Sequence, residues 1–304
     1  MSGVTRVQFE QKRAEKPQPE RRGIKKGLYL IPSLFTTANI LMGFFAITGS
    51  LRGFQMLVIG TPEAMARAAQ LFDGAAMFIG WAFVFDSLDG RIARMTKTTT
   101  EIGVQFDSIA DVVTFGIAPA VLAYTWGYGS AFREGTDLHN LGWFLSFMFL
   151  MCGAFRLARF NVQATRPRVL AEGTPKVDKK SFVGLPIPAA AALIAAIVHF
   201  APNPIAYYGG ERAQLYGALL MGLVALLGAL MVSTLRYSSF KSAGTTRRST
   251  RMMILLIGAV GMLIWLYSRY VLLAIVTAYV LQGILFRLGS IFRRRPDKTA
   301  TAEG

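Results

Sequence analysis

Residues 213–235 read AQLYGALLMGLVALLGALMVSTL, a run without any Asp, Glu, Lys or Arg. A helix needs about 20 mainly apolar residues to cross the hydrocarbon core of a bilayer, so this run is long enough. Three other runs without these residues are also long enough, at residues 27–51, 138–155 and 181–210. The sequence therefore predicts an all-α integral membrane protein with at least four spanning helices.

The composition supports this class. The 304 residues are 53% hydrophobic and only 16% charged, whereas about a quarter of the residues in a soluble domain are charged. The aromatic content of 12% excludes a disordered chain, and Cys152, as the single cysteine, excludes an internal disulfide scaffold.

Four further segments complete a predicted bundle of about eight helices. Residues 252–268 and 270–286 are uncharged and are separated only by Arg269, which predicts a tight hairpin of two spans. The segments 71–88 and 104–126 are apolar overall, but both contain aspartates.

The positive charges predict the orientation, because Lys and Arg accumulate in short cytoplasmic loops. With eight spans and both termini in the cytoplasm, 28 of the 33 Lys and Arg residues fall on the cytoplasmic side and five on the other. We expect basic cytoplasmic tails at residues 1–26 and 289–304 around a membrane domain at 27–288. Topology explains the net charge of +16, so no nucleic-acid partner is predicted.

Four aspartates lie where an apolar span should exclude them, which makes them candidate functional residues. Asp86 and Asp89 are three residues apart, and Asp107 and Asp111 are four apart, so each pair shares one helix face. A short basic turn between the two helices would bring the four carboxylates together near the cytoplasmic surface. The alternatives are a packed polar cluster or a path for cations.

A hard divalent cation would neutralise such a cluster, and Mg²⁺ or Mn²⁺ is favoured because no histidine is near in the sequence. These ions commonly engage phosphate oxygens as well. Gly90, Ala93 and Gly103 offer a face without bulk for a nucleotide or pyrophosphate, and Arg91 and Arg94 offer positive charge for phosphate.

The pattern D-x2-D-G-x2-A-R-x8-G-x3-D-x3-D, matched over residues 86–111, resembles the signature of the CDP-alcohol phosphotransferases, which are membrane enzymes of phospholipid synthesis. The resemblance implies a site for two Mg²⁺ or Mn²⁺ ions held by Asp86, Asp89 and Asp107, with Asp111 as a further candidate ligand. It also implies that Asp111 is the general base that takes the proton of the attacking alcohol, with Asp111 beside the metal ligands and CMP as the leaving group.

Three other stretches resemble the phosphatidylserine synthase branch of this family: residues 31–43, 153–161 and 182–188. The resemblance implies CDP-diacylglycerol and L-serine as substrates. In the first stretch, Thr36 and Asn39 are candidate contacts of the CDP-lipid. In the second, Arg156, Arg159 and Asn161 are candidates for binding serine or phosphate, although the arginines also fit a simple topological role.

Several alternatives remain open from the sequence. The acceptor could be glycerol phosphate, inositol phosphate or choline, and a rival from another class is a non-enzymatic membrane protein that handles cations. We expect a bacterial inner membrane location, contacts with membrane lipids and a possible homodimer. His139 and His199 are not expected to be ligands, and Asp73 is expected at the outer start of a helix.

Overall fold

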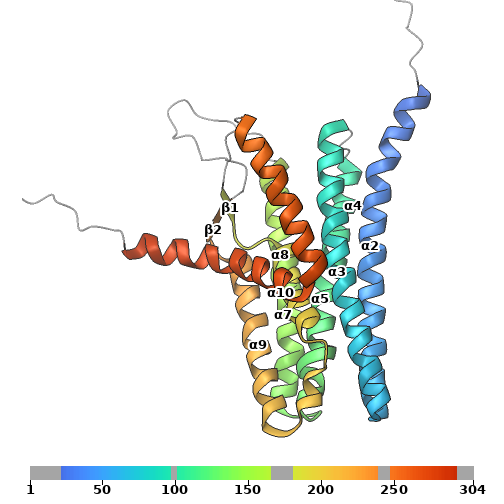
Figure 1. The fold of residues 1–304 in the computed structure, drawn as a ribbon, viewed down its shortest axis with the longest axis vertical. Helices are drawn as coiled ribbons and strands as arrows, with labels where there is room; N and C mark the ends of the chain where they lie inside the picture. Colours follow the sequence, from blue (N-terminus) through green and yellow to red (C-terminus); the bar gives the residue numbers. More distant parts are fainter. Residues whose placement is uncertain (1–21, 97–100, 166–180, 239–246, 293–304) are drawn as a thin grey trace, which may run out of the picture.

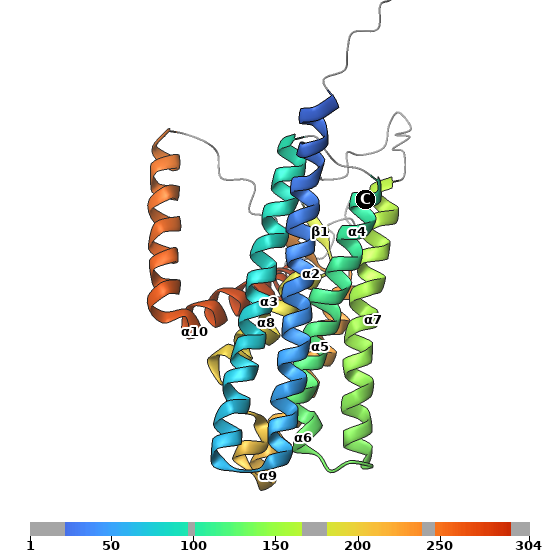
Figure 2. The ribbon, with the colours of Figure 1, turned by 90° about the vertical axis from the view of Figure 1, so that its right-hand side faces the viewer.

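The computed structural model describes residues 22–96, 101–165, 181–238 and 247–292, and these are almost entirely helical (Figure 1). The longer helices are α2 (Arg22–Ile59), α3 (Pro62–Thr96), α4 (Glu101–Asp111), α7 (Asp137–Thr165), α8 (Ile187–Phe200), α9 (Gly210–Val232) and α10 (Arg247–Phe292). Most of them run along one common direction, and α3, α2, α4 and α7 stand in this order from left to right across the face seen in Figure 2. The prediction of an all-α membrane protein is confirmed.

Seven segments of the described residues are long and apolar enough to cross a membrane, one fewer than predicted. They are Leu34–Ile59, Pro62–Ile92, Ile102–Ala131, Asp137–Val162, Ile187–Tyr208, Gly210–Val232 and Leu255–Leu285. The two segments with internal aspartates are therefore among the candidate spans, as the sequence predicted.

The difference lies in α10. In place of the predicted hairpin of two spans, α10 consists of two helical halves that meet in a sharp kink at Tyr267, whose φ of −136° and ψ of 44° are not helical. Its first half stands beside the bundle and its second half runs across toward α8 (Figures 1 and 2). Arg269 suggested a surface turn, but the structure pairs it with an aspartate of α3, so the chain does not need to leave the membrane there.

The third span is built from α4 and irregular helix. After Asp111 come the π-helical segment η1 (Val112–Ile117), α5 (Ala118–Leu122), a second π-helical segment η2 (Ala123–Tyr128) and α6 (Gly129–Ala131). Pro119 lacks a backbone N–H and so cannot complete the regular α-helical hydrogen bonding in this region. Such irregular backbone is tolerated at membrane depth where it is buried in protein, and Thr114, Phe115 and Gly116 are buried.

Small residues allow the helices to approach closely. A Cβ atom added to Gly43 of α2 would lie 2.5 Å from Thr114 Oγ1 and 3.0 Å from the Thr114 backbone. The Thr114 hydroxyl donates a hydrogen bond of 3.1 Å to the carbonyl oxygen of Asn39. This contact fixes α2 against the third span.

Two short strands flank the pair of helices α8 and α9: β1 (Ser181–Val183) comes before α8, and β2 (Arg236–Ser238) follows α9. β1 pairs antiparallel with β2, with Phe182 opposite Tyr237. Gly184 follows β1 at φ +83°, a conformation that favours glycine, and its N–H bonds to the Leu235 carbonyl 2.8 Å away. The remaining connections are short: η3 (Ile205–Tyr208) joins α8 to α9.

Parts of three predicted segments lie outside the described residues. They are residues 1–21 and 293–304, which make up most of the predicted tails, and residues 97–100 of the predicted basic turn.

Candidate metal and substrate site

Three of the four predicted aspartates, from α3 and α4, meet near α2, against which both of these helices pack. Carboxylate oxygens of Asp86, Asp107 and Asp111 all lie within 4.8 Å of one another, and each of these residues is partly buried. Asp86 comes from the last third of α3, and the other two project one helical turn apart from α4. The spacing in the sequence thus produces the predicted convergence for these three residues.

Asp89 is the fourth predicted ligand, and it is oriented by α2. It is buried, with 6% of its surface exposed, and its Oδ2 accepts a hydrogen bond from the Thr36 hydroxyl. It does not join the compact group of three carboxylates, although it lies close enough to Asp86 and Asp107 to interact with them electrostatically. Thr36, predicted as a contact of the CDP-lipid, therefore positions an aspartate.

Asn39, one turn after Thr36, faces the interior of the bundle. Only 1% of its surface is exposed, and neither its side-chain oxygen nor its side-chain nitrogen has a hydrogen-bond partner. Because a buried amide without a partner is costly, such a group is a candidate for contact with a ligand or water.

Arg156 of α7 completes the buried part of the site. Its guanidinium interacts electrostatically with Asp111, and its Nε is buried without a hydrogen-bond partner. The Oδ1 atom of Asp111 is likewise buried and unpaired. The site therefore contains a cation whose charge acts on the aspartate that the family resemblance names as the general base.

The other two predicted residues of α7 lie farther along the helix. The Asn161 side-chain amide donates a hydrogen bond of 2.8 Å to the Ser108 hydroxyl, which lies on α4 beside Asp107. Arg159 is exposed. Asn161 therefore ties α7 to the helix that carries two of the aspartates.

The surface of small residues that was predicted to accommodate a nucleotide or pyrophosphate is exposed where the structure describes it. Gly90, Arg91 and Gly103 are all exposed, on the ends of α3 and α4 that lead into residues 97–100. The side chains of Ala93 and Arg94 lie outside the described part of the structure, so their predicted contacts with nucleotide and phosphate stay predictions.

The three gathered carboxylates fit a hard divalent cation, because such ions prefer oxygen ligands. The unpaired Oδ1 of Asp111 supports this interpretation, since a buried carboxylate oxygen without a partner needs a proton, a cation or water. The acidic group can thus hold a metal ion, with Asp86, Asp107 and Asp111 as the closest set of ligands.

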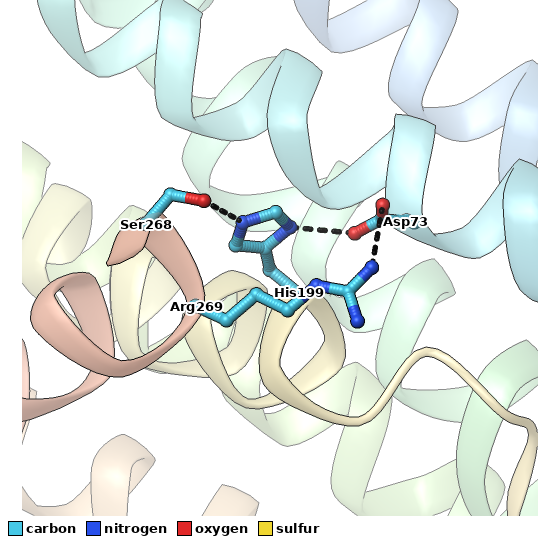
Figure 3. A network of polar contacts seen from close by, with 4 residues as sticks. All are labelled: Asp73, His199, Ser268 and Arg269. Atoms are coloured by element: carbon cyan, nitrogen blue, oxygen red, sulfur yellow. Dashed lines mark hydrogen bonds and ion pairs between the residues drawn. The ribbon is translucent and has the colours of Figure 1, made fainter. Parts of the chain in front are cut away.

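A second polar cluster lies away from these aspartates and was missed from the sequence. Asp73 was expected at an outer helix start, but it lies inside the second span and contacts His199 of α8 (Figure 3). The His199 ring bridges Asp73 Oδ1 at 2.6 Å and the Ser268 hydroxyl at 3.0 Å, and Arg269 Nη2 lies 3.9 Å from Asp73 Oδ2. The signal available in the sequence was the presence of Asp73 and Arg269 in otherwise uncharged segments.

The comparison with known proteins agrees with the motif. A family model described as CDP-alcohol phosphatidyltransferase matches residues 29–232, about two thirds of the chain. The chain belongs to this family. The matched range includes α3, α4 and α7, which carry the aspartates and Arg156, and ends where α9 ends, before α10 begins.

Among similar proteins, the CDP-diacylglycerol--serine O-phosphatidyltransferase of Helicobacter pylori is 36% identical over 70% of this chain and 74% of its own length. The protein of the same name from Methanocaldococcus jannaschii is 35% identical over 52% of this chain and 61% of its own length. The archaetidylserine synthase of Methanothermobacter thermautotrophicus is 28% identical over 71% of this chain and 72% of its own length.

Proposed function

We propose that this protein transfers a phosphatidyl group from CDP-diacylglycerol to the hydroxyl of L-serine, giving phosphatidylserine and CMP. The observation that carries the proposal is the convergence of Asp86, Asp107 and Asp111 beside Arg156 in a chain that belongs to the CDP-alcohol phosphatidyltransferase family. Serine as the acceptor is supported by the names of relatives that match most of their length.

In this reaction the serine oxygen attacks the lipid-side phosphorus of the pyrophosphate. A new P–O bond forms, the P–O bond to CMP breaks, and CMP leaves with the electron pair. Two Mg²⁺ or Mn²⁺ ions held by Asp86, Asp89, Asp107 and Asp111 would neutralise charge on the phosphate oxygens and align the reacting groups. Asp111 accepts the hydroxyl proton, a role that requires a carboxylate within reach of the attacking oxygen.

The remaining residues bind the two substrates. Gly90, Ala93 and Gly103 leave room for the nucleotide against the helix backbone, and Arg91 and Arg94 offset phosphate charge. Thr36 holds Asp89 in place, while the unpaired side-chain amide of Asn39 binds the CDP-lipid directly or through a water molecule.

We assign Arg156 to the serine carboxylate, because its Nε is buried and without a partner and its charge acts on Asp111. A guanidinium binds a carboxylate through two parallel hydrogen bonds, which would also orient the serine hydroxyl. Arg159 and Asn161 act at the rim of the same site, where Arg159 is exposed and Asn161 contacts Ser108.

The site would then face the cytoplasm of a bacterial inner membrane, where CDP-lipid and serine meet. The excess of Lys and Arg predicted on that side supports this placement. We also expect a homodimer formed through membrane-exposed helix faces with small residues.

The decisive experiment is an acceptor panel. Purified protein is incubated with CDP-diacylglycerol, Mn²⁺ or Mg²⁺, and one of serine, glycerol phosphate, inositol phosphate or choline, and CMP and lipid products are measured. We expect CMP and phosphatidylserine with serine only, and loss of both products when the metal is chelated. The Asp107→Asn variant is the matched control for contaminating activity.

Two outcomes would contradict the proposal in different ways. CMP release with inositol phosphate but not with serine would keep the enzyme class and remove serine as the acceptor. No CMP with any alcohol, together with metal-dependent ion flux in vesicles, would favour the rival function in cation handling.

A further inference from the structure

The two helices that carry the gathered aspartates are held in place by their neighbours. In Figure 2, α2 stands between α3 and α4, and α7 stands on the other side of α4. Among the described residues, α3 and α4 both pack against α2, whereas they approach each other closely at few positions at most. The carboxylate oxygens of Asp86, Asp107 and Asp111 nevertheless lie within 4.8 Å of one another. Their spacing therefore depends on how α2 and α7 hold α3 and α4.

The contact of α2 with α3 includes a hydrogen bond to an aspartate. The Thr36 hydroxyl donates to Oδ2 of Asp89, and the two residues are buried, with 5% and 6% of their surfaces exposed. Carboxylates that bind metal ions are commonly oriented by such outer hydrogen bonds. Thr36 thus fixes Asp89, which lies one turn after Asp86, against α2.

A second hydrogen bond holds α4 from the side of α7. The Asn161 side-chain nitrogen donates to the Ser108 hydroxyl oxygen at 2.8 Å, and this hydroxyl donates in turn to the Val104 carbonyl oxygen at 2.9 Å. Because the Ser108 proton is used on Val104, the Ser108 oxygen is left to accept from the amide, so the direction of both bonds is fixed. Ser108 follows Asp107 directly and precedes Asp111 by three residues. Asn161 thus anchors α4 between the two aspartates.

The direct contact between α4 and α7 is otherwise small. Among the residues that the structure describes, α7 packs mainly on η1, η2 and α9, and it approaches α4 closely at few positions at most. The hydrogen bond from Asn161 therefore accounts for much of what holds α4 at a fixed distance from α7. Asn161 was predicted to bind serine or phosphate, but one of its amide N–H groups is used on the protein instead.

We propose that Thr36 and Asn161 are positioning residues that set the affinity of the aspartate site for its divalent cation. Thr36 acts on α3 through Asp89. Asn161 acts on α4 through Ser108. The proposal rests on the proposed function, in which the aspartates hold Mg²⁺ or Mn²⁺. Ligands drawn from two helices bind an ion tightly when the helices are fixed before the ion arrives, because less order has to be created on binding. Loss of either hydrogen bond therefore weakens metal binding.

This role differs from a direct contact with substrate in what it predicts. A residue that binds serine or the CDP-lipid changes the KM for that substrate, and it leaves metal binding unchanged when no substrate is present. A positioning residue changes metal binding in protein without substrate. Titration of the purified protein with Mn²⁺, followed by the paramagnetic resonance signal of the free ion, measures this binding directly.

The first test removes the Thr36 hydroxyl and keeps the shape of the side chain. We expect Thr36→Val to weaken Mn²⁺ binding about tenfold or more, because loss of an outer hydrogen bond to a metal ligand commonly costs a factor of about 10–100. Thr36→Ser keeps the hydroxyl and should restore binding. Thr48→Val is the matched control, because the Thr48 hydroxyl donates to carbonyl oxygens of its own helix, at 3.0 and 3.2 Å. Mn²⁺ binding by Thr36→Val equal to that of the wild type, or weakened equally in Thr48→Val, would overturn the role of Thr36.

The second test treats Asn161 and Ser108 as a pair. Both residues are only partly buried, so this test decides the proposal if Thr36→Val does not fold. Asn161→Ala and Ser108→Ala should each weaken Mn²⁺ binding severalfold. The double variant should bind no less tightly than the weaker single variant, because both changes remove the same bond. Asn140→Ala, at the opposite end of α7, is the matched control and should bind Mn²⁺ as the wild type does.

Two results of this second test would refute the positioning role of Asn161. The first is unchanged Mn²⁺ binding in Asn161→Ala, and a raised KM for serine in the same variant would make Asn161 a substrate-binding residue. The second is a set of losses that multiply in the double variant, which would show that Asn161 does not act through Ser108.

Failure of the proposed function is distinguishable from failure of this inference. The wild-type protein is first titrated with Mn²⁺ and then assayed with the acceptor panel. Mn²⁺ binding that depends on Thr36 and Asn161, without CMP release in the presence of serine, would refute the proposed function alone. Turnover with serine, together with Mn²⁺ binding that none of the variants alters, would refute the inference alone. Wild-type protein that binds no Mn²⁺ would refute the inference together with the proposed metal site.

Discussion

At the scale of single residues, Asp111 differs from the other aspartates in its surroundings. It belongs to the group of three carboxylates, its Oδ1 has no hydrogen-bond partner, and it interacts with the Arg156 guanidinium. Asp89, by contrast, already accepts a hydrogen bond from Thr36. A free oxygen is what a proton acceptor requires, so the geometry favours Asp111 over Asp89 as the general base.

We predict that Asp111→Asn lowers kcat at least a hundredfold, because an amide cannot accept the hydroxyl proton, and loss of a general base commonly costs a factor of 10² to 10⁴. Binding of CDP-diacylglycerol should change far less, since three aspartates remain. Turnover and nucleotide binding are measured on the same preparation, with Asp111→Glu as the control that keeps the carboxylate. Turnover in Asp111→Asn equal to the wild type would assign the base elsewhere.

The sequence predicts part of this site because helical periodicity relates spacing to direction. The three- and four-residue spacings correctly bring Asp86, Asp107 and Asp111 together. The hydrogen bonds from Thr36 to Asp89 and from Asn161 to Ser108 each join residues 53 positions apart. No local pattern encodes such contacts, because they depend on how separate helices pack.

At the scale of elements, the contact between α2 and the third span connects packing to the site. Gly43 lies one turn after Asn39, and Thr114 lies three residues after Asp111, so the Gly43–Thr114 contact fixes the separation of two parts of the site. A side chain at Gly43 would push these elements apart, because the backbone of Thr114 is only 3.0 Å from the added Cβ.

We predict that Gly43→Ala lowers the melting temperature by several degrees, since overpacking costs about 1–3 kcal/mol, and also lowers kcat. Gly80→Ala is the control, because an added Cβ there has no neighbour within 4 Å. Thermal unfolding in detergent and CMP release are the measurements. Equal behaviour of the two variants would mean that the close approach of α2 to Thr114 is not required.

The element that the sequence predicts least well is α10. Uncharged runs on both sides of Arg269 predict two helices, and the location of the interruption at Tyr267 agrees within two residues. The predicted hairpin failed because Arg269 is paired with Asp73 of α3, and a residue 196 positions away cannot be inferred from local charge.

At the scale of the whole molecule, the distribution of charge and the number of spans give different placements of the C-terminus. Seven crossings would put the two termini on opposite sides, whereas the positive residues favour both termini in the cytoplasm. We expect the C-terminus in the cytoplasm, because the five Lys and Arg residues from Arg287 onward would otherwise be translocated, against the tendency of Lys and Arg to stay on the cytoplasmic side.

We therefore predict that cysteines introduced at Ser2 and at Ala302, in a Cys152→Ser background, are both labelled only from the cytoplasmic side. Glu134→Cys, in the exposed connection before α7, is the control and should be labelled from the opposite side. A membrane-impermeant maleimide applied to intact cells and to inverted vesicles provides the measurement. Labelling of residue 302 together with residue 134 would show that α10 crosses the membrane once.

The pairing of Asp73 with Arg269 also sets an order for biogenesis. Asp73 enters the bilayer with the second span, but its cationic partner is synthesised almost 200 residues later. Until then the nascent chain carries an uncompensated carboxylate at membrane depth, for which His199 can supply only part of the neutralisation. A chain that stops after α9 would remain in that state, so α10 is needed to complete the charge pairing of the second span.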